Sequence, residues 1–372
     1  MKTHRILNLI GWLVSGILLF LWQENYLPFH YEYIEQFRLF HSSAESFIEH
    51  ASYPSGLVEY IASYLIQFFS QPYWGAGIIT LLFLIIGIGM QLIFKRICPR
   101  VDMPLAYLLP VLLLLFAGMD LNYHLEGTLA FALTVWLLNL QIRITRPLYR
   151  IISGGLLSWI IFYLAGPAFV VFALCSVIYE WHKRELPIVY SALLLPVAVL
   201  PACYAYFIAH SEPFRILFLP DAYTNHKVEG QPILYYAWMA LPLLFALACL
   251  LGRWKKTVSS IVKGASVSIQ LLVLVIILFQ GNEKYNSPSL AQVKALDYYS
   301  RNKLWDHILG LQVSSNNNIE STCFKNMAMA QKGILADKGL YHKQLGNKAL
   351  WIDWDQSSTV STLLSDLYYA MG

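Results

Sequence analysis

The chain has 372 residues, of which 57% are hydrophobic and 13% charged, and its formal net charge is +4. This balance excludes an ordinary soluble domain, in which about a quarter of the residues are charged. The basic residues are spread over short turns between apolar stretches, so no basic patch of the kind that binds nucleic acid is present.

Nine apolar stretches along the chain predict a polytopic membrane protein. A helix that crosses the hydrocarbon core needs about 20 apolar residues, because lipid offers its backbone no hydrogen bonds. The predicted spans are 6–22, 73–94, 103–118, 127–142, 151–164, 168–179, 186–208, 233–251 and 261–279.

Two of these stretches, 151–164 and 168–179, are short and meet at Gly166 and Pro167. They form either a tight hairpin of two short crossings or one re-entrant element buried among neighbouring helices. Because the two stretches count together, the orientation of the later spans is the same in both cases.

The basic residues between the spans predict the orientation, because Lys and Arg near span ends stay in the cytoplasm. The opposite connections carry only Arg38, Arg215 and Lys227. The N-terminus is therefore predicted to be cytoplasmic and the tail after the ninth span extracytoplasmic. The cytoplasmic connections carry Lys2, Arg5, Lys95, Arg96, Arg100, Arg143, Arg146, Arg150, Lys183, Arg184, Arg253, Lys255 and Lys256.

The first outer connection, 23–72, is unusually long, and long ordered loops are often functional. Apolar residues at helical spacing over 34–48 and 57–69 predict two helices that lie in the membrane interface. Glu32 or Glu35 could overhang a membrane cavity as a catalytic base or a metal ligand. The role of a base is favoured there because partial desolvation raises the pKa of a carboxylate. Alternatively, the acids remain here only because outer loops exclude Lys and Arg.

A second outer segment, 118–127, contains Asp120, His124 and Glu126. If it forms a helical turn, Asp120 and His124 share one face and can act as a proton-transfer pair or hold an ion. The alternative is a hydrated turn in which Glu126 caps the next helix.

A third outer segment, 209–232, holds two of the rare outer cations, Arg215 and Lys227. Both are suited to contact a phosphate headgroup. Alternatively, Arg215 only extends from an apolar surface towards water.

The tail, 281–372, changes character, since long apolar runs disappear and charges of both signs balance. Amphipathic patterns predict helices over 290–299, 304–313, 319–336, 343–350 and 362–371. The stretch 295–309 is similar to a tetratricopeptide helix pair. A repeat array normally closes with a polar helix, whereas this one stops at aromatic residues. The tail is therefore predicted to be an incomplete module or to pair its open end with a partner.

The whole chain resembles an uncharacterised family of bacterial multi-pass membrane proteins with a tetratricopeptide-like tail. The residues that carry this resemblance are PSGLVEY at 54–60, NYHLEG at 122–127 and LDYYSRNKLW at 296–305. It implies a bacterial inner-membrane location and no established activity. The layout of a first span, a long outer loop and many short-looped spans also looks like the GT-C glycosyltransferases.

In GT-C enzymes an acidic residue of the first outer loop acts on a polyprenyl-phosphate sugar. By position that likeness implies a catalytic role for Glu32 or Glu35, with Asp120 as a second acid. The substrate-binding candidates remain His124, Arg215 and Lys227, which were selected from their own segments. Directly after the first span the chain has Gln23, Glu24 and Asn25 rather than paired acids. The sequence assigns no metal site and leaves the cofactor open.

Two functions follow from these observations. The protein is either a GT-C-like transferase that acts on a lipid-linked sugar in envelope glycan assembly, or a membrane anchor whose tail binds another envelope protein. The expected fold is all-α in both cases, with a membrane helix bundle over 1–280 and a soluble helical module over 281–372.

Overall fold

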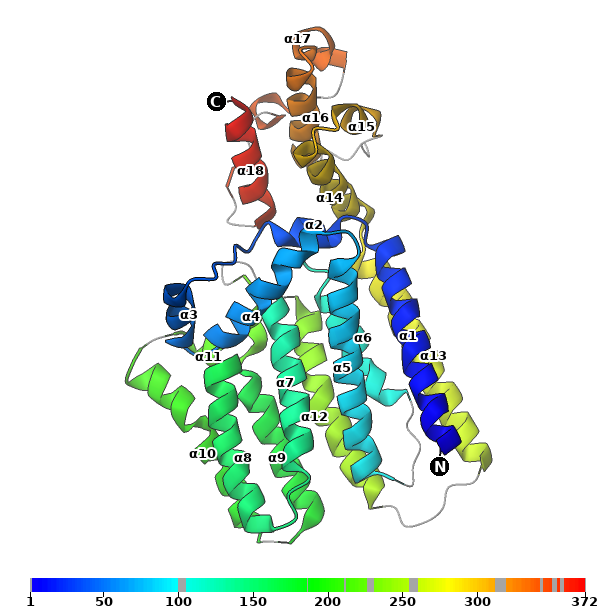
Figure 1. Ribbon diagram of the computed structural model, residues 1–372, viewed down its shortest axis with the longest axis vertical. Helices are drawn as coiled ribbons and strands as arrows, with labels where there is room; N and C mark the ends of the chain where they lie inside the picture. Colours follow the sequence, from blue (N-terminus) through cyan, green and yellow to red (C-terminus); the bar gives the residue numbers. More distant parts are fainter. Residues whose placement is uncertain are drawn as a thin grey trace. The chain divides into compact units, whose positions relative to one another are not determined.

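The computed structural model describes residues 2–99, 105–185, 187–210, 212–225, 231–253, 260–311, 319–341, 344–349, 353–354 and 358–371. Within these residues the protein is all-α, as predicted (Figure 1). It has 18 α-helices, five short 3₁₀ segments and one isolated β-bridge, between Tyr123 and Thr224.

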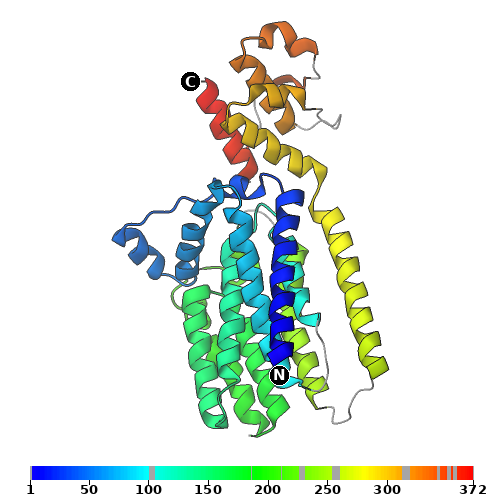
Figure 2. The ribbon, with the colours of Figure 1, turned by 45° about the vertical axis from the view of Figure 1, so that its right-hand side comes forward.

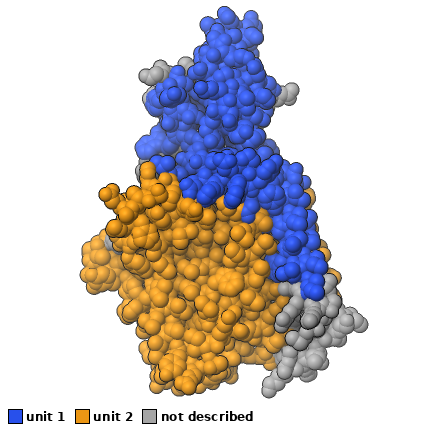
Figure 3. All heavy atoms as spheres, viewed as in Figure 1, with its two compact units in different colours: residues 1–39, 66–77, 283–372 blue, residues 40–65, 78–282 orange. Residues whose placement is uncertain are grey.

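The chain forms two compact units, which Figure 3 colours separately. Unit 1 comprises residues 1–39, 66–77 and 283–372, and unit 2 comprises residues 40–65 and 78–282. The tail helices therefore share a unit with the first helix and the start of the first outer connection.

Unit 2 contains most of the apolar helices, which run side by side in two views (Figures 1 and 2). Its helices are α3 (Ala44–Ala51), α4 (Gly56–Ile66), α5 (Trp74–Ile97), α6 (Leu109–Ala117), α7 (Leu125–Gln141), α8 (Pro147–Ala165), α9 (Ala168–Lys183), α10 (Ile188–Phe207), α11 (Phe214–Phe218), α12 (Pro232–Gly252) and α13 (Ser260–Tyr285).

Among the described residues, five helices are long and apolar enough to cross a membrane, where the sequence predicted nine crossings. They are α5, α8, α10, α12 and the Gly264–Tyr285 part of α13. The predicted span 6–22 lies within α1 (Lys2–Tyr26). The predicted spans 103–118, 127–142 and 168–179 fold as the shorter helices α6, α7 and α9, of 9, 17 and 16 residues.

Helix α9 lies at the centre of unit 2, where it packs against α7, α8, α10 and α12. The joint between α8 and α9 is a turn at Gly166, whose φ of 62° favours glycine. Two separate helices thus flank Gly166 and Pro167, which favours the hairpin over a single re-entrant element.

Buried polar groups connect these apolar helices. Asn139 on α7 donates its side-chain amide to the Gly89 carbonyl on α5 over 2.8 Å. Arg150 on α8 is fully buried and pairs with Glu180 on α9, with a second contact of 3.0 Å to Glu185. A buried guanidinium persists only where carboxylates compensate its charge, so this ion pair fixes α8 against α9.

Unit 1 contains α1, α2 (His30–Glu35), α14 (Pro288–Arg301), α15 (Trp305–Gly310), α16 (Ile319–Gln331), α17 (Leu335–Lys338) and α18 (Ser358–Met371). Four tail helices, α14, α15, α16 and α18, share a hydrophobic core built from Leu296, Ile308, Cys323, Phe324, Met327, Ala328 and Leu363.

The predicted tail helices are found with changed bounds. The predicted helix 304–313 is shortened to α15, and 319–336 is divided into α16 and α17. Of the predicted helix 343–350, the described part is a 3₁₀ turn, Gly346–Ala349. Residues 314–318, which separate the predicted helices 304–313 and 319–336, lie outside the described residues.

The first outer connection differs from prediction in one respect. The continuous helical pattern over 34–48 folds as two helices, α2 and α3. Ser43 ends the continuity because its side-chain oxygen accepts the Ser46 amide at 3.1 Å and so caps α3. The second predicted helix, 57–69, is α4 followed by a 3₁₀ turn, Gln67–Ser70.

Candidate functional site

Helix α14 packs against α2 within unit 1, and this contact buries ionisable groups. Lys294 Nζ lies 2.7 Å from His30 Nδ1, and the two residues are 3% and 1% exposed. Lysine is almost never this buried without a partner. We call the contact formed by His30, Gln36, Lys294, Asp297 and Arg301 the tail seat.

Asp297 is the second buried charge of the tail seat. Its Oδ2 accepts hydrogen bonds from Gln36 Nε2 and Arg301 Nε, each at 2.9 Å. Arg301 also donates to the carbonyl of Glu32 over 3.1 Å. Side chains of α14 therefore bind both side-chain and backbone groups of the first outer connection, which ties two segments far apart in sequence.

Burial favours the uncharged forms of Lys294 and Asp297, and so brings the pKa of each closer to 7. It lowers the pKa of Lys294 to about 8. Burial also raises the pKa of Asp297 to about 6, and Arg301 and Gln36 oppose that rise while Asp366 on α18 adds to it. Such groups bind or release a proton near neutral pH more readily than exposed ones.

Aromatic side chains extend the seat beside α2. Phe29 stacks on Tyr298 with ring centroids 4.4 Å apart and meets Tyr299 edge-on. Phe29 precedes α2 with a φ of 59°, a conformation that a non-glycine residue adopts only where its surroundings hold it. Stacking on α14 supplies such a constraint.

The predicted catalytic acids Glu32 and Glu35 both lie on α2, half-buried, in unit 1. The backbone carbonyl of Glu32 accepts a hydrogen bond from Arg301 of the tail seat. Helix α2, which was expected to overhang a membrane cavity, thus packs against α14. Catalysis by these two acids stays a prediction.

The predicted site residues of unit 2 lie on two outer connections that pair with each other. The His124 amide donates to the Tyr223 carbonyl and the Asn225 amide to the Asn122 carbonyl, each over 2.9 Å. The sequence did not indicate that the segments 118–127 and 209–232 meet.

Asp120 and His124 do not share a helical turn, so of the two alternatives for this segment the structure shows the turn. Asp120 lies in a turn, where its Oδ1 accepts the Asn122 amide at 3.0 Å, and His124 is extended at the N-terminus of α7. The pairing with 221–225 draws this segment out of helical conformation. Burial raises the pKa of Asp120. Glu126 lies in the first turn of α7, as expected of a capping acid.

Arg215 lies on α11, where its guanidinium is 2.9 Å from Asp221. Tyr235 also donates to Asp221, from α12, and so holds this carboxylate in place. The guanidinium remains largely exposed and can meet a further anion. Lys227 lies outside the described residues.

Sequence reasoning missed the tail seat. Lys294 and Asp297 lie next to the apolar positions of α14. A charged residue beside the apolar stripe of a helix was the one sequence signal that could have pointed to a buried charge there. Their partners, His30 and Gln36, are more than 250 residues away, so no local pattern could pair them. In the described part of the chain, no three His, Cys, Asp or Glu side chains form a group that could hold a metal ion.

These features define an all-α protein with helices long and apolar enough to span a membrane, and with a C-terminal helix, α14, that packs against α2. The chain belongs to a family of unknown function, DUF6057, whose model matches residues 3–372. The expectation of a family that covers the whole chain and lacks an assigned activity is therefore confirmed. Neither the curated proteins nor the solved structures gave a match to this chain.

Proposed function

We propose that the protein is a membrane-anchored adaptor of the bacterial inner membrane whose tail binds another envelope protein. The tail seat is the observation that carries this proposal. A tail that binds a partner must itself be held by the membrane anchor, and the buried contacts of Lys294 with His30 and of Asp297 with Gln36 join α14 to the α2 segment. We also propose the orientation that the basic residues predict, with the tail outside the cytoplasm.

The tail exposes side chains that favour protein recognition. Leu340, Tyr341 and Tyr369 are 91%, 85% and 90% exposed. Large apolar and aromatic residues are costly in water and dominate the binding energy of protein interfaces. Tyr369 lies on α18, whose other face is buried by Leu363 and Leu367. This fits the prediction that the last helix pairs with a partner.

Site-specific photocrosslinking in cells tests the adaptor function. A crosslinker in place of Leu340 should yield one discrete protein adduct, whereas a crosslinker in place of Lys303, exposed on the turn between α14 and α15, should yield none. The double substitution Tyr341→Ser and Tyr369→Ser should abolish the Leu340 adduct without changing membrane insertion. Equal adducts at both positions, or none at Leu340, would remove the proposal.

A second candidate function is a GT-C-like transferase that acts on a lipid-linked sugar. The pairing of the two outer connections favours it, because it gathers Asp120, His124 and Arg215 on two hydrogen-bonded segments. In this scheme Glu32, Glu35 or Asp120 takes the acceptor's proton, and His124, Arg215 and Lys227 hold the substrate. The raised pKa of Asp120 suits a proton acceptor.

The two functions differ in which variants lose activity. In the transferase, Glu32→Ala, Glu35→Ala and Asp120→Asn should each abolish an envelope-glycan phenotype, and deletion of the tail should only weaken it. In the adaptor, the deletion should abolish the phenotype and the three substitutions should have little effect. A triple variant with full activity would eliminate the transferase.

A further inference from the structure

Three cations from different helices line one cavity of about 650 Å³ in unit 2. Arg96 lies near the end of α5, Arg143 follows α7, and Lys183 ends α9. The cavity lies between the ends of these helices and the end of α12, at Gly252. This end of unit 2 is the one that the basic residues assign to the cytoplasmic membrane surface.

Among the residues that the structure describes, no carboxylate opposes these cations. The described lining of the cavity contains no Asp or Glu, and none of the three cations forms an ion pair with a described residue. The nearby Arg150 behaves differently, because Glu180 and Glu185 neutralise it. The described residues around the cavity therefore concentrate positive charge without a compensating acid.

The walls of the cavity are fixed by the surrounding structure. Tyr179 donates its hydroxyl to the Ile142 carbonyl over 3.3 Å, and its ring lies 5.6 Å from Lys183 Nζ. At Gly252 an added Cβ would lie 2.4 Å from the Ile97 carbonyl oxygen, so α12 and α5 approach closely there. Arg96 and Lys183 thus project from helices whose ends are held in close contact, and Arg143 projects from the turn that follows α7.

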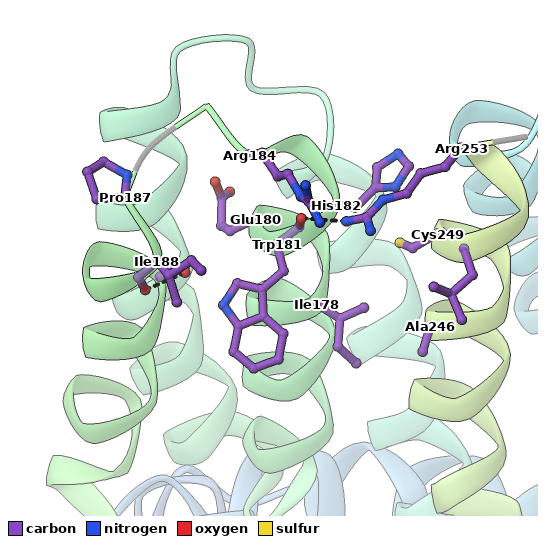
Figure 4. A pocket seen from close by; sticks show the side chains of 12 residues that line it. Ile178, Glu180, Trp181, His182, Arg184, Pro187, Ile188, Ala246, Cys249 and Arg253 are labelled. Carbon is purple, nitrogen blue, oxygen red and sulfur yellow. Dashed lines mark hydrogen bonds between the residues drawn. The ribbon is translucent and has the colours of Figure 1, made fainter. Parts of the chain in front are cut away.

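A second cavity, of about 860 Å³, shares His182 with the first. Figure 4 shows its lining, which includes the apolar side chains of Ile178, Trp181, Ile188 and Ala246. Its one acid, Glu180, is already bound by Arg150 over 2.9 Å. Nδ1 of His182 is buried and has no hydrogen-bond partner. The polar cavity and the mainly apolar cavity therefore both border His182, whose Nδ1 is available for a hydrogen bond.

We propose that the two cavities bind one anionic phospholipid, with its phosphate among Arg96, Arg143 and Lys183 and an acyl chain along Trp181 and Ile178. Charge complementarity selects this occupant. The cytoplasmic leaflet holds anionic lipids, and basic cavities between membrane helices are suited to their headgroups. An apolar neighbour of this size suits an acyl chain better than it suits a free phosphate ion.

Native mass spectrometry of the full chain in mixed-lipid nanodiscs tests this site. The probe is phosphatidylglycerol titrated against phosphatidylcholine. The double substitution Arg96→Gln and Arg143→Gln should weaken phosphatidylglycerol retention about tenfold or more, since each cation near the surface contributes appreciably to headgroup binding. Neighbouring cations that line neither cavity supply the control, Lys95→Gln with Arg146→Gln, which should change retention less than twofold.

Two outcomes would overturn the proposal. If both double variants retain phosphatidylglycerol equally poorly, the cations attract lipid only through the general positive charge of this surface and not through a defined site. If millimolar inorganic phosphate displaces phosphatidylglycerol from the wild type, the site is one for a soluble anion and not for a lipid. Melting temperatures measured without lipid should match for wild type and both variants, because the four substituted side chains are exposed.

Discussion

Lys294 Nζ and His30 Nδ1 are 2.7 Å apart although 264 residues separate them in the chain. A protonated lysine can only donate, so in that state Nζ of Lys294 donates a hydrogen bond to Nδ1 of His30. The pair joins α2 to α14, the first helix of the tail. Stability and pH dependence of the tail seat follow from this arrangement.

Asp297→Ala should loosen the tail from α2. The substitution leaves Gln36 and Arg301 without their acceptor, which costs roughly 1–3 kcal/mol. Hydrogen exchange of α14 should accelerate accordingly, while the membrane helices keep their protection. Asp306→Ala is the matched control in the same module, because its ion pair with Lys332 is exposed and is worth at most about 1 kcal/mol. Equal exchange in both variants would show that the seat does not hold α14.

The tail seat should weaken as pH rises from about 4 to about 6. The folded state raises the pKa of Asp297 to about 6, so it binds this proton more tightly than the unfolded state does. The resulting stabilisation is present at low pH and is lost as pH rises through the folded pKa. Opening free energies of α14 from hydrogen exchange, corrected for intrinsic rates, should show this slope in the wild type. They should show none in Asp297→Asn.

The lowered pKa of Lys294, about 8, acts in the opposite sense at alkaline pH. The folded state favours the neutral amine, so stability should rise between about pH 8 and 10.5. The seat is therefore expected to be weakest between about pH 6 and 8. The substitution Lys294→Met should remove the alkaline rise and leave the acidic slope in place.

Removal of Arg150 should strongly destabilise unit 2. Arg150→Ala leaves Glu180 buried without its counter-charge, and such losses cost about 3–5 kcal/mol. The double substitution Arg150→Leu and Glu180→Leu removes both charges and should recover most of the loss. Thermal melting of the purified protein measures both effects, with Arg146→Ala as the exposed control. A double variant no more stable than Arg150→Ala would contradict this account.

The proposed orientation can be tested with one introduced thiol. Cys98, Cys175, Cys249 and Cys323 are buried, and Cys203 is half-buried. Burial also raises the pKa of Cys323 to about 11, which makes this thiol unreactive. In intact cells, an impermeant maleimide should therefore label Leu340→Cys but not Lys183→Cys until the cells are lysed. The reverse pattern would invert the topology.

The membrane class of the protein could be predicted from the sequence because each apolar stretch is a local property. Helices α8, α10, α12 and α13 fall where apolar runs indicated spans. Prediction failed where a neighbour decides the conformation. Ser43 splits the periodic run over 34–48 by capping α3, and Thr224 pairs with Tyr123 and draws the Asp120–His124 segment out of helical form.

The sequence by itself determined that the chain is helical and apolar enough for a bilayer, because composition and period act over a few neighbouring residues. The sequence also places most Lys and Arg residues on alternate connections between the apolar stretches. Only the tertiary structure decided which of these residues meet, because the partners lie on different helices. Lys294 meets His30, Arg150 meets Glu180, and Arg96 lines one cavity together with Arg143. Burial, which shifts proton affinities and makes an uncompensated charge costly, arises from that packing.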